Sequence, residues 1–526
     1  MATFITSIQI SNSEAITIPN GPSLTYKALG DVTGHLQSIF NNESSPLFSS
    51  AKPQTAIAIA LPNNLELVSS FLAITNASRI AAPLNPNYKK AEFDFYFGDL
   101  AAKAVIVPKG QHLKESSPIV LSAKDNDVLL IEAWWDVSRG RVEFEIFNHS
   151  SIAPIYRSLD HPVFINGLTR FPGTAKPDEI ALILHTSGTT GRPKTVPLTH
   201  ANITRSISNI ANTYKLSLHD RSYIVMPLFH VHGLIGALLS TLHTQGAVIV
   251  PSKFSASHFW NDFVKYKATW YSAVPTIHLI LLNVPKPSPF PNIRFIRSCS
   301  AALAPPTFHR LEKEFNAPVL EAYAMTEASH QMTSNNLPPG IRKPGTVGQG
   351  QGVEVVILDE AGNKLPQGKT GEVSIRGSNV TKGYANNDKA NAESFTNGYF
   401  RTGDQGFLDR DGFLNLTGRL KELINRGGEK ISPIELDGVL LGHKDVQEAV
   451  AFGVPDAKYG QIVNAAIVLK KGSNTSADDL KTFLSDKIAK FKIPEKFFFV
   501  DTLPKTATGK IQRRNIAVVF ASKAKL

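Results

Sequence analysis

Short apolar runs alternate with helical patterns over the first part of the chain. Residues 55–61 have the apolar, strand-forming composition of a buried strand, and residues 64–78 carry the spacing of a helix that follows it. Residues 80–84 and 104–107 repeat the strand pattern. Strands separated by helices predict a parallel sheet that is covered on both faces.

The same rhythm continues through the middle of the chain and then changes. A strand pattern at 180–185 precedes a glycine-rich turn and a helix pattern at 199–213. Further strands are expected at 222–226, 247–250 and 295–298. Between residues 353 and 376 strand-like segments are joined by Gly, Asp and Pro turns, which predicts a smaller antiparallel unit.

The last hundred residues have the pattern of a separate unit. Strands are predicted at 448–454, 463–469 and 497–500, and helices at 477–490 and at the end of the chain. The whole pattern predicts an α/β protein in two parts. Residues 1–419 would form a large body of two αβ-layered subdomains plus a small β unit, and residues 420–526 a small, mobile α+β lid domain.

Composition narrows the class of protein. The chain has 526 residues, of which 42% are hydrophobic and 19% charged, the balance of a globular protein. No apolar run approaches the roughly 18 residues of a membrane-spanning helix, and the first residues lack the pattern of a secretory signal. The one cysteine, Cys299, excludes an intramolecular disulfide. It is a nucleophile or a small buried apolar side chain, and the absence of an activating group in its sequence surroundings favours the second.

The net charge of +11 indicates an anionic partner. The basic excess is densest between residues 490 and 514. Nucleic acid is one such partner, but no helix-turn-helix, zinc-finger or RNA-binding signature accompanies the basic residues. A polyphosphate small molecule is therefore the simpler interpretation, and for any single lysine a solvated surface position remains open.

A glycine- and hydroxyl-rich loop, TSGTTGRPKT at 186–195, lies between a predicted strand and a predicted helix. In that context backbone N–H groups bind phosphate oxygens. The loop is not a Walker A motif, because Pro193 stands before Lys194 where that motif has glycine. The sequence therefore predicts a phosphate-binding loop of another kind, with a merely flexible loop as the alternative.

Three further segments carry side chains suited to a nucleotide. Thr326 and Glu327 offer a hydroxyl for phosphate and a carboxylate for Mg²⁺, although Thr326 also suits a helix N-cap. Asp404 would accept hydrogen bonds from ribose hydroxyls, with Arg419 as a phosphate or hydroxyl partner, although such turns are also structural. Lys510 lies in a turn of small residues from which it would reach a cleft, or stay solvated.

Two histidines at alternate positions, His230 and His232, would share one side of a strand. They would form a zinc pair if a third ligand lay nearby, but none is apparent in the sequence. The wall of a polar pocket and a buried core histidine are the other two interpretations.

Taken together and in this order, these segments resemble those of the adenylate-forming enzymes, which include acyl-CoA synthetases, 4-coumarate–CoA ligases and luciferases. The resemblance covers nearly the whole chain, and GRLKELINRGGEKISPIEL at 418–436 is similar to the interdomain signature of the family. The segments APLNPNY (82–88), MPLFHVHGL (226–234), RSCSAA (297–302) and EAYAMTEASH (321–330) resemble more closely the fungal peroxisomal CoA synthetases and plant oxalate–CoA ligases.

The resemblance implies a set of roles. The residues it places at ATP or AMP are Thr186, Ser187, Gly188, Thr189, Thr190, Gly191, Lys194, Ser300, Ala301, Glu321, Ala322, Thr326, Asp404 and Arg419. Glu327 would hold Mg²⁺. The catalytic set would be Lys510, which acts in adenylation, with Lys430 and Arg419. Gly427 and Gly428 would lie on the CoA path, and Lys421 would be the hinge. Related ligases often have lysine where Asn425 stands, so that contact is not carried over.

The resemblance also implies a two-step reaction. A carboxylate attacks the α-phosphate of Mg-ATP to give acyl-AMP and pyrophosphate, and the CoA thiol then displaces AMP. For the acid we expect His230, Ser300 and His330 as polar contacts, because a small dianion such as oxalate needs donors near both carboxylates. A medium-chain fatty acid or a cinnamate remains an alternative within the same chemistry. A non-catalytic peroxisomal binding protein and a nucleic-acid-binding protein are the alternatives outside it.

The last three residues, Ala524, Lys525 and Leu526, have the small–basic–Leu form of a peroxisomal targeting signal. They agree with the resemblance to peroxisomal enzymes. The sequence therefore predicts a protein of the peroxisomal matrix, with peripheral membrane association as an alternative, that is in the cytosol before import and binds the import receptor through this tripeptide.

Overall fold

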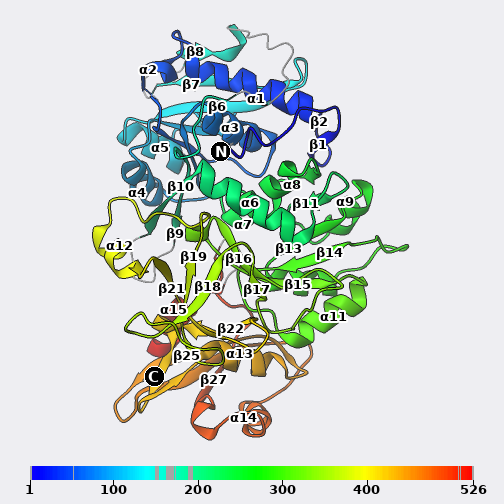
Figure 1. The fold of residues 1–526 in the computed structure, drawn as a ribbon, viewed down its shortest axis with the longest axis vertical. Helices are drawn as coiled ribbons and strands as arrows, with labels where there is room; N and C mark the ends of the chain where they lie inside the picture. Colours follow the sequence, from blue (N-terminus) through cyan, green and yellow to red (C-terminus); the bar gives the residue numbers. More distant parts are fainter. Residues whose placement is uncertain are drawn as a thin grey trace.

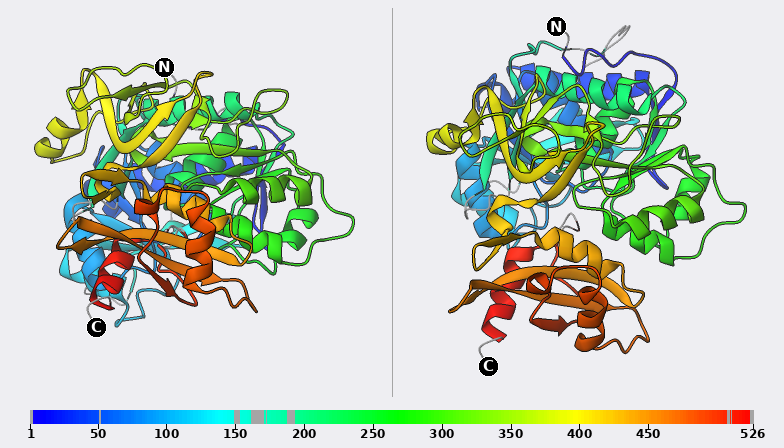
Figure 2. Two further views of the ribbon diagram at one scale, coloured as in Figure 1. Left: turned by 90° about the horizontal axis from the view of Figure 1, so that it is seen from below. Right: turned by 60° about the horizontal axis from the view of Figure 1, so that its bottom comes forward.

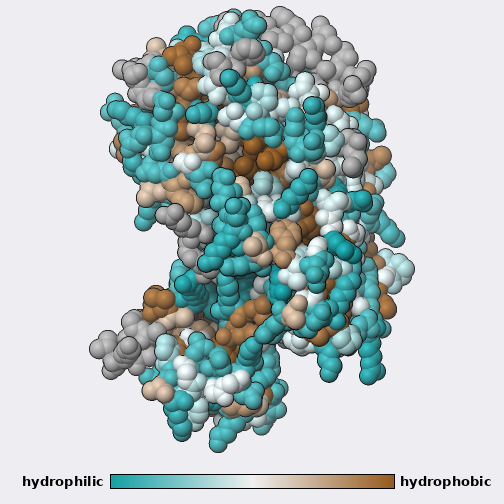
Figure 3. All heavy atoms as spheres, turned by 60° about the vertical axis from the view of Figure 1, so that its left-hand side comes forward, coloured by the Kyte–Doolittle hydropathy of each residue, from teal (hydrophilic) through white to brown (hydrophobic). Residues whose placement is uncertain are grey.

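A computed structural model of the chain describes residues 3–50, 52–148, 153–160, 171, 173–186, 193–506, 509 and 511–523. A large N-terminal body stands above a smaller C-terminal unit, and the right-hand view of Figure 2 shows the two parts as separate bodies (Figures 1 and 2). In the space-filling view the surface is hollowed between the two parts (Figure 3).

The first subdomain is built on an eight-stranded sheet. In spatial order its strands are β10 (Lys194–Thr199), β9 (Ile180–Thr186), β4 (Ile80–Pro83), β3 (Ala56–Ile59), β5 (Ala104–Pro108), β6 (Leu129–Asp136), β7 (Arg141–Phe147) and β8 (Tyr156–Arg157). The central strands from β9 to β6 are parallel. Its helices are α1 (Tyr26–Asn41), α2 (Pro46–Ser50), α3 (Leu65–Asn76), α4 (Lys90–Leu100) and α5 (Pro118–Asp125).

Alternate residues of strand β3 show that this sheet is covered on both faces. Ile57 and Ile59 belong to the core that includes helices α1 and α3, whereas Ala56 and Ala58 belong to the core that includes α4 and α5. This arrangement confirms the parallel, two-sided sheet that the apolar runs predict.

The second subdomain is built on a nine-stranded sheet. Its strands in order are β17 (Gln349–Gly350), β16 (His330–Ser334), β15 (Val319–Met325), β14 (Phe295–Ser298), β13 (Trp270–Ala273), β11 (Arg221–Tyr223), β12 (Ala247–Ile249), β1 (Glu14–Thr17) and β2 (Ser23–Thr25). The run from β15 to β1 is parallel.

Helices cover both faces of this second sheet. Helices α9 (Phe259–Lys265), α10 (Pro275–Asn283) and α11 (Pro305–Phe315) pack in one apolar cluster. Helix α6 (His200–Tyr214), α7 (Val231–Gly233), the π-helical segment η2 (Leu234–Leu239) and α8 (Ser240–His243) lie in the layer between the two large sheets. Helix α6 begins with a capping box in which Thr199 and Asn202 bond to each other's backbone N–H.

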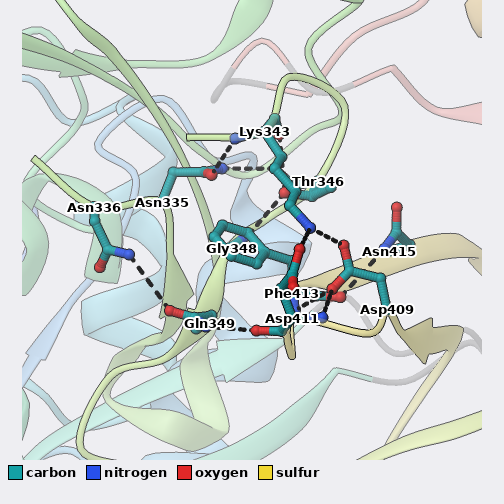
Figure 4. A network of polar contacts seen from close by, with 10 residues as sticks. All are labelled: Asn335, Asn336, Lys343, Thr346, Gly348, Gln349, Asp409, Asp411, Phe413 and Asn415. Carbon is teal, nitrogen blue, oxygen red and sulfur yellow. Dashed lines mark hydrogen bonds and ion pairs between the residues drawn. The ribbon is translucent and has the colours of Figure 1, made fainter. Parts of the chain in front are cut away.

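A small antiparallel unit follows, as the sequence predicts. It contains β18 (Glu354–Leu358), β19 (Gly371–Arg376), β20 (Phe395–Thr396), β21 (Tyr399–Leu408) and β22 (Leu414–Arg419), with α12 (Asp388–Ser394) beside them. Lys343 fastens the preceding loop to it, because Nζ lies 2.6 Å from a carboxylate oxygen of both Asp409 and Asp411 (Figure 4).

The C-terminal unit has a sheet and apolar clusters of its own. Its strands are β23 (Ile424–Arg426), β24 (Glu429–Ile431), β25 (Val446–Asp456), β26 (Gly460–Leu469) and β27 (Lys496–Phe499), and its helices are α13 (Pro433–Leu441), α14 (Ala477–Ser485) and α15 (Arg513–Lys523). One 3₁₀ turn, η4 (Leu420–Glu422), joins this unit to β22. The predicted fold class, a large layered body with a small α+β unit, is confirmed.

Two predicted elements are shorter than expected. The helix predicted at 477–490 ends at Ser485, and a separate 3₁₀ turn, η5 (Lys490–Lys492), follows it because Ile488 and Ile493 turn back onto the core. The strand predicted at 222–226 ends at Tyr223. Beyond it, the Asn63 side chain bonds the carbonyl of Met226 and the N–H of Leu228.

Candidate active site

The candidate residues of the second subdomain gather at one edge of its sheet. His230 follows β11, Ser300 follows β14, and Thr326 and Glu327 follow β15, all in the parallel part of the sheet. Crevices outside the carboxyl ends of parallel strands are the usual place for ligands in α/β proteins. The topology therefore brings together residues that lie up to a hundred positions apart.

The described ends of the predicted phosphate loop are paired across two strands. Thr186 ends β9 and is the register partner of Lys194, which begins β10. Ser187, Gly188, Thr189, Thr190 and Gly191 lie outside the described residues. Lys194 Nζ lies 4.4 Å from the centre of the Tyr384 ring, in cation–π contact.

Glu327 contacts the same tyrosine, Tyr384, as Lys194 does. Its carboxylate is buried and accepts a 2.7 Å hydrogen bond from the Tyr384 hydroxyl. Burial raises the pKa of Glu327, and the Lys194 ammonium and Arg419 guanidinium act in the opposite direction. Thr326 begins the 3₁₀ turn η3 (Thr326–Ala328), whose N-cap residue is Met325. Thr326 is therefore not the N-cap that was its alternative role.

Asp404 and Arg419 form an ion pair, with Arg419 Nε 3.0 Å from Asp404 Oδ1. The other carboxylate oxygen accepts a hydrogen bond from the Tyr323 hydroxyl. Burial, together with the Asp404 charge, raises the pKa of Tyr323. The aspartate is thus held in one orientation from two sides.

The residues predicted near adenine occupy different environments. Ser300 has a left-handed backbone, with φ of +73°, and Ala301 beside it is exposed. Glu321 and Ala322 are buried in β15. The Glu321 carboxylate accepts a 3.0 Å hydrogen bond from the Gly345 N–H, and burial raises its pKa to about 8. The side chain of Glu321 is thus bonded to the loop that precedes the small β unit.

Two of the three residues predicted for the acid, Ser300 and His330, contact the same buried histidine, His232. His330 is completely buried, and its ring lies 5.4 Å from the ring of His232. His232 Nδ1 lies 3.0 Å from Ser300 Oγ, and its Nε2 lies 2.7 Å from Ser272 Oγ. His230 caps helix α7, where its Nδ1 accepts the His232 N–H.

The prediction that the two histidines share one side of a strand is wrong, because His230 caps helix α7 and His232 lies within that helical turn. His232 is fully buried with both ring nitrogens occupied by serines, so it has no nitrogen left for a metal. In the part of the chain that the structure describes, no three His, Cys, Asp or Glu side chains cluster as a metal site. Cys299 is buried, as expected of a small apolar side chain.

The predicted hinge and CoA residues lie at the start of the C-terminal unit. Lys421 is exposed in the turn η4. Gly427 and Gly428 form the exposed turn between β23 and β24, with φ of +60° and +95°, angles that favour glycine. Lys430 is exposed too, and its Nζ lies 4.0 Å from Glu360 of the small β unit.

Lys510 lies outside the described residues, whereas the preceding residue, Gly509, is described. A side-chain carbon at Gly509 would stand 3.1 Å from Thr276 Oγ1 and 3.3 Å from Val274 Cγ2. Both residues follow β13, on the same sheet edge as Ser300. Gly509 of the C-terminal unit therefore lies against the N-terminal body.

Two profiles of known protein families together match most of the chain. The profile of the AMP-binding enzyme matches residues 44–385, and that of the AMP-binding enzyme C-terminal domain matches residues 435–510. The chain belongs to the AMP-binding enzyme family.

Relatives of this AMP-binding enzyme match it end to end. It is 60% identical to the oxalate–CoA ligase of Saccharomyces cerevisiae, over 100% of this chain and 98% of the relative. It is 47% identical to the oxalate–CoA ligase of Arabidopsis thaliana, over 97% and 96%.

Solved structures share the fold. MatB from Rhodopseudomonas palustris is 27% identical over 97% of this chain and 96% of that protein, with a TM-score of 0.84 for its ATP-bound structure. Its apo structure gives 0.74 at the same identity and coverage. Because the identity and coverage are equal, the difference reflects the arrangement of the chain, and this AMP-binding enzyme is closer to the ATP-bound arrangement.

Several residues that contact these candidates have no recognisable signal in the sequence. Tyr323 and Tyr384 orient the two acidic groups, and Ser272 bonds to His232. Arg297 in β14 is fully buried, and its guanidinium contacts His330 Nδ1. Arg297 is the exception, because a charged residue inside the apolar strand at 295–298 is a signal that could have found it.

Proposed function

We propose that this AMP-binding enzyme joins oxalate to coenzyme A at the expense of ATP, through an oxalyl-adenylate, and releases AMP and pyrophosphate. The observation that carries the proposal is the 60% identity to a yeast oxalate–CoA ligase over the full length of both chains. The placement of Ser300 and His330 on either side of His232 supports it, because a small dianion needs donors at short range.

In the first step, an oxalate oxygen attacks the α-phosphorus and the bond to the β-phosphate oxygen breaks. The loop at 186–194 would hold the β- and γ-phosphates, Thr326 the α-phosphate, and Asp404 the ribose hydroxyls. Ser300, Ala301, Glu321 and Ala322 would line the adenylate site. Lys510 would stabilise negative charge as it passes from the attacking carboxylate to pyrophosphate.

Mg²⁺ fits the donor set at Glu327. Mg²⁺ is usually held by one or two carboxylates together with substrate phosphates and water, and Glu327 is a buried carboxylate close to Lys194 of the phosphate loop. When bound, the ion would neutralise phosphate charge. The Tyr384 hydroxyl, which bonds Glu327, orients that carboxylate.

In the second step, the CoA thiol displaces AMP from the anhydride. We propose residues 1–419 and 420–526 as the two domains and Lys421 as their hinge. The seating of Gly509 and the likeness to an ATP-bound arrangement support an adenylation orientation. Rotation at Lys421 would then withdraw Lys510 and bring Gly427, Gly428 and Lys430 to the CoA path.

We also propose the peroxisomal matrix as its location, with import through Ala524, Lys525 and Leu526. These three residues lie outside the described part of the chain. No helix among the described residues is long and apolar enough to cross a bilayer. A fluorescent protein fused before residue 1 should co-localise with peroxisomes, and removal of the tripeptide should leave the fusion in the cytosol.

The proposed reaction is tested by pyrophosphate release with Mg-ATP and CoA. The acids are oxalate, malonate, succinate, octanoate and 4-coumarate, and oxalyl-CoA is identified by mass spectrometry. Preferential turnover of oxalate is the expected result. Preferential turnover of octanoate or 4-coumarate would overturn the substrate, and no turnover by protein that binds ATP would favour a binding protein. Salt-sensitive duplex binding would reveal the nucleic-acid partner that the basic charge allows.

A further inference from the structure

Arg297 is a buried cation without a carboxylate partner. It is 0% exposed, and its guanidinium donates to Tyr214 Oη, Ser272 Oγ, His330 Nδ1 and Gln331 Oε1 at 2.8, 3.2, 3.3 and 3.0 Å. All four acceptors are neutral groups. Among the described residues no Asp or Glu pairs with it, whereas the nearby Arg294 pairs with Asp220 at 2.7 Å.

The bond to His330 determines where that ring carries its hydrogen. A guanidinium only donates, so His330 Nδ1 must accept. Burial and the Arg297 charge both lower the pKa of His330, so the ring is neutral and its one hydrogen lies on Nε2. Within the described chain Nε2 has no hydrogen-bond partner. It is therefore a buried donor without an acceptor.

That donor lies against Gly236, a residue without a side chain. A side-chain carbon at Gly236 would stand 2.6 Å from His330 Nε2. Gly236 lies in η2, directly after the helical turn that His230 caps. Any larger residue at 236 would therefore clash with the His330 ring and displace its Nε2.

A second chain of hydrogen bonds connects Arg297 to Ser300. Ser272 Oγ accepts from Arg297 Nη1, so its single hydrogen is available for His232 Nε2 at 2.7 Å. His232 is neutral too, because burial and the Arg297 charge lower its pKa. Its hydrogen then lies on Nδ1 and is donated to Ser300 Oγ at 3.0 Å. The Ser300 hydroxyl is left with its own hydrogen to donate.

We propose that Arg297 is a positioning residue that determines acid specificity. It directs the hydrogens of His330 Nε2 and the Ser300 hydroxyl toward the acid, and it provides the positive charge that a small dicarboxylate requires. The inference rests on the proposed function, since it explains how that site selects a dianion over a monocarboxylic acid. His232 and His330 are neutral and supply hydrogen bonds only, so the positive charge that compensates the dianion is that of Arg297.

The first experiment tests the hydrogen positions without any substrate. Long-range ¹H–¹⁵N spectra of protein labelled with ¹⁵N-histidine, assigned with His232→Gln and His330→Gln, should show Nδ1–H for His232 and Nε2–H for His330. In Arg297→Met at least one ring should lose its single tautomer. The opposite tautomer of His330 in the wild-type protein, or unchanged rings in Arg297→Met, would overturn the inference.

The second experiment measures specificity, with Arg294→Met as the matched control. Arg297→Met should raise KM for oxalate at least about tenfold and leave KM for ATP within about twofold, and Arg297→Lys should recover part of the loss. Arg294→Met, which removes a carboxylate-paired guanidinium, should leave both values within about twofold. Equal rises for oxalate and ATP, or the same effect in Arg294→Met, would show a merely structural role.

The two experiments separate failure of the inference from failure of the proposed function. If the wild-type protein does not use oxalate, the substrate is wrong, but the tautomers are still measured on their own. If Arg297→Met does not fold, the wild-type spectra decide whether His330 carries its hydrogen on Nε2.

Discussion

Asp404 and Arg419 are direct partners across two antiparallel strands, and their side chains form an ion pair at 3.0 Å. Arg419 is the last residue of β22, and the turn that contains Lys421 follows at once. The proposed ribose contact and the proposed hinge are therefore adjacent. A change in the orientation of the C-terminal unit would begin beside the nucleotide.

Replacement of Asp404 by asparagine should weaken AMP binding at least about tenfold, or roughly 1.4 kcal/mol, because a charged acceptor for the ribose hydroxyls becomes neutral. Isothermal titration calorimetry with AMP measures the effect. Asp411→Asn, which removes an exposed partner of Lys343, is the control and should leave the affinity unchanged. Equal affinity in Asp404→Asn and the wild type would remove Asp404 from the nucleotide site.

Replacement of Lys510 by alanine should abolish formation of the acyl-adenylate and leave thioester formation from supplied oxalyl-AMP largely intact. The lysine is proposed to stabilise charge only in the first step. Rapid-quench measurements of each half-reaction give the two rates, and Lys505→Ala, a nearby lysine that pairs with Glu448, is the control. Equal loss of both half-reactions would refute the assignment.

Replacement of His330 by alanine should raise KM for oxalate at least about tenfold, equivalent to roughly 1.4 kcal/mol, because a donor to the dianion is lost. KM for ATP should change little. His309→Ala changes an exposed histidine on helix α11 and serves as the control. An unchanged KM for oxalate would show that His330 lies outside the acid site.

Buried histidines should make the protein less stable as the pH falls below about 6.5. Burial lowers the pKa of His200 from 6.5 to about 4, so between these values the unfolded state binds a proton that the folded state does not. For His200 alone, the free energy of unfolding falls by about 1 kcal/mol between pH 7.5 and 5.5.

Urea unfolding of the wild type and His200→Phe at both pH values tests this effect. Phenylalanine suits the site because His200 stacks on Phe4, with ring centroids 5.0 Å apart. Between pH 7.5 and 5.5 the free energy of unfolding of the variant should fall by about 1 kcal/mol less than that of the wild type. The same pH dependence in both proteins would contradict the buried, neutral state of His200.

Much of the fold follows from the sequence because strand and helix periodicities are local. The apolar runs at 55–61 and 80–84 predict the centre of a parallel sheet, and the structure places β3 and β4 there as parallel neighbours. Segment ends are less predictable. Asn63 binds the chain at Met226, and that contact depends on a residue more than 160 positions away.

The site could be predicted in part. Short motifs in the sequence single out Asp404, Arg419 and Glu327 as candidates. Arg297 could not be assigned a role, because its meaning depends on Ser272 and His330, which come from other strands of the sheet. Tautomers and buried charges of this kind are properties of the assembled sheet.

The transfer of ¹⁸O from labelled oxalate shows whether the reaction passes through an acyl-adenylate. If the carboxylate attacks the α-phosphorus of ATP, each turnover must leave one ¹⁸O atom in AMP, which mass spectrometry detects. An acyl-adenylate route gives singly labelled AMP and unlabelled pyrophosphate. Unlabelled AMP, or label in inorganic phosphate with ADP as the product, would contradict an acyl-adenylate.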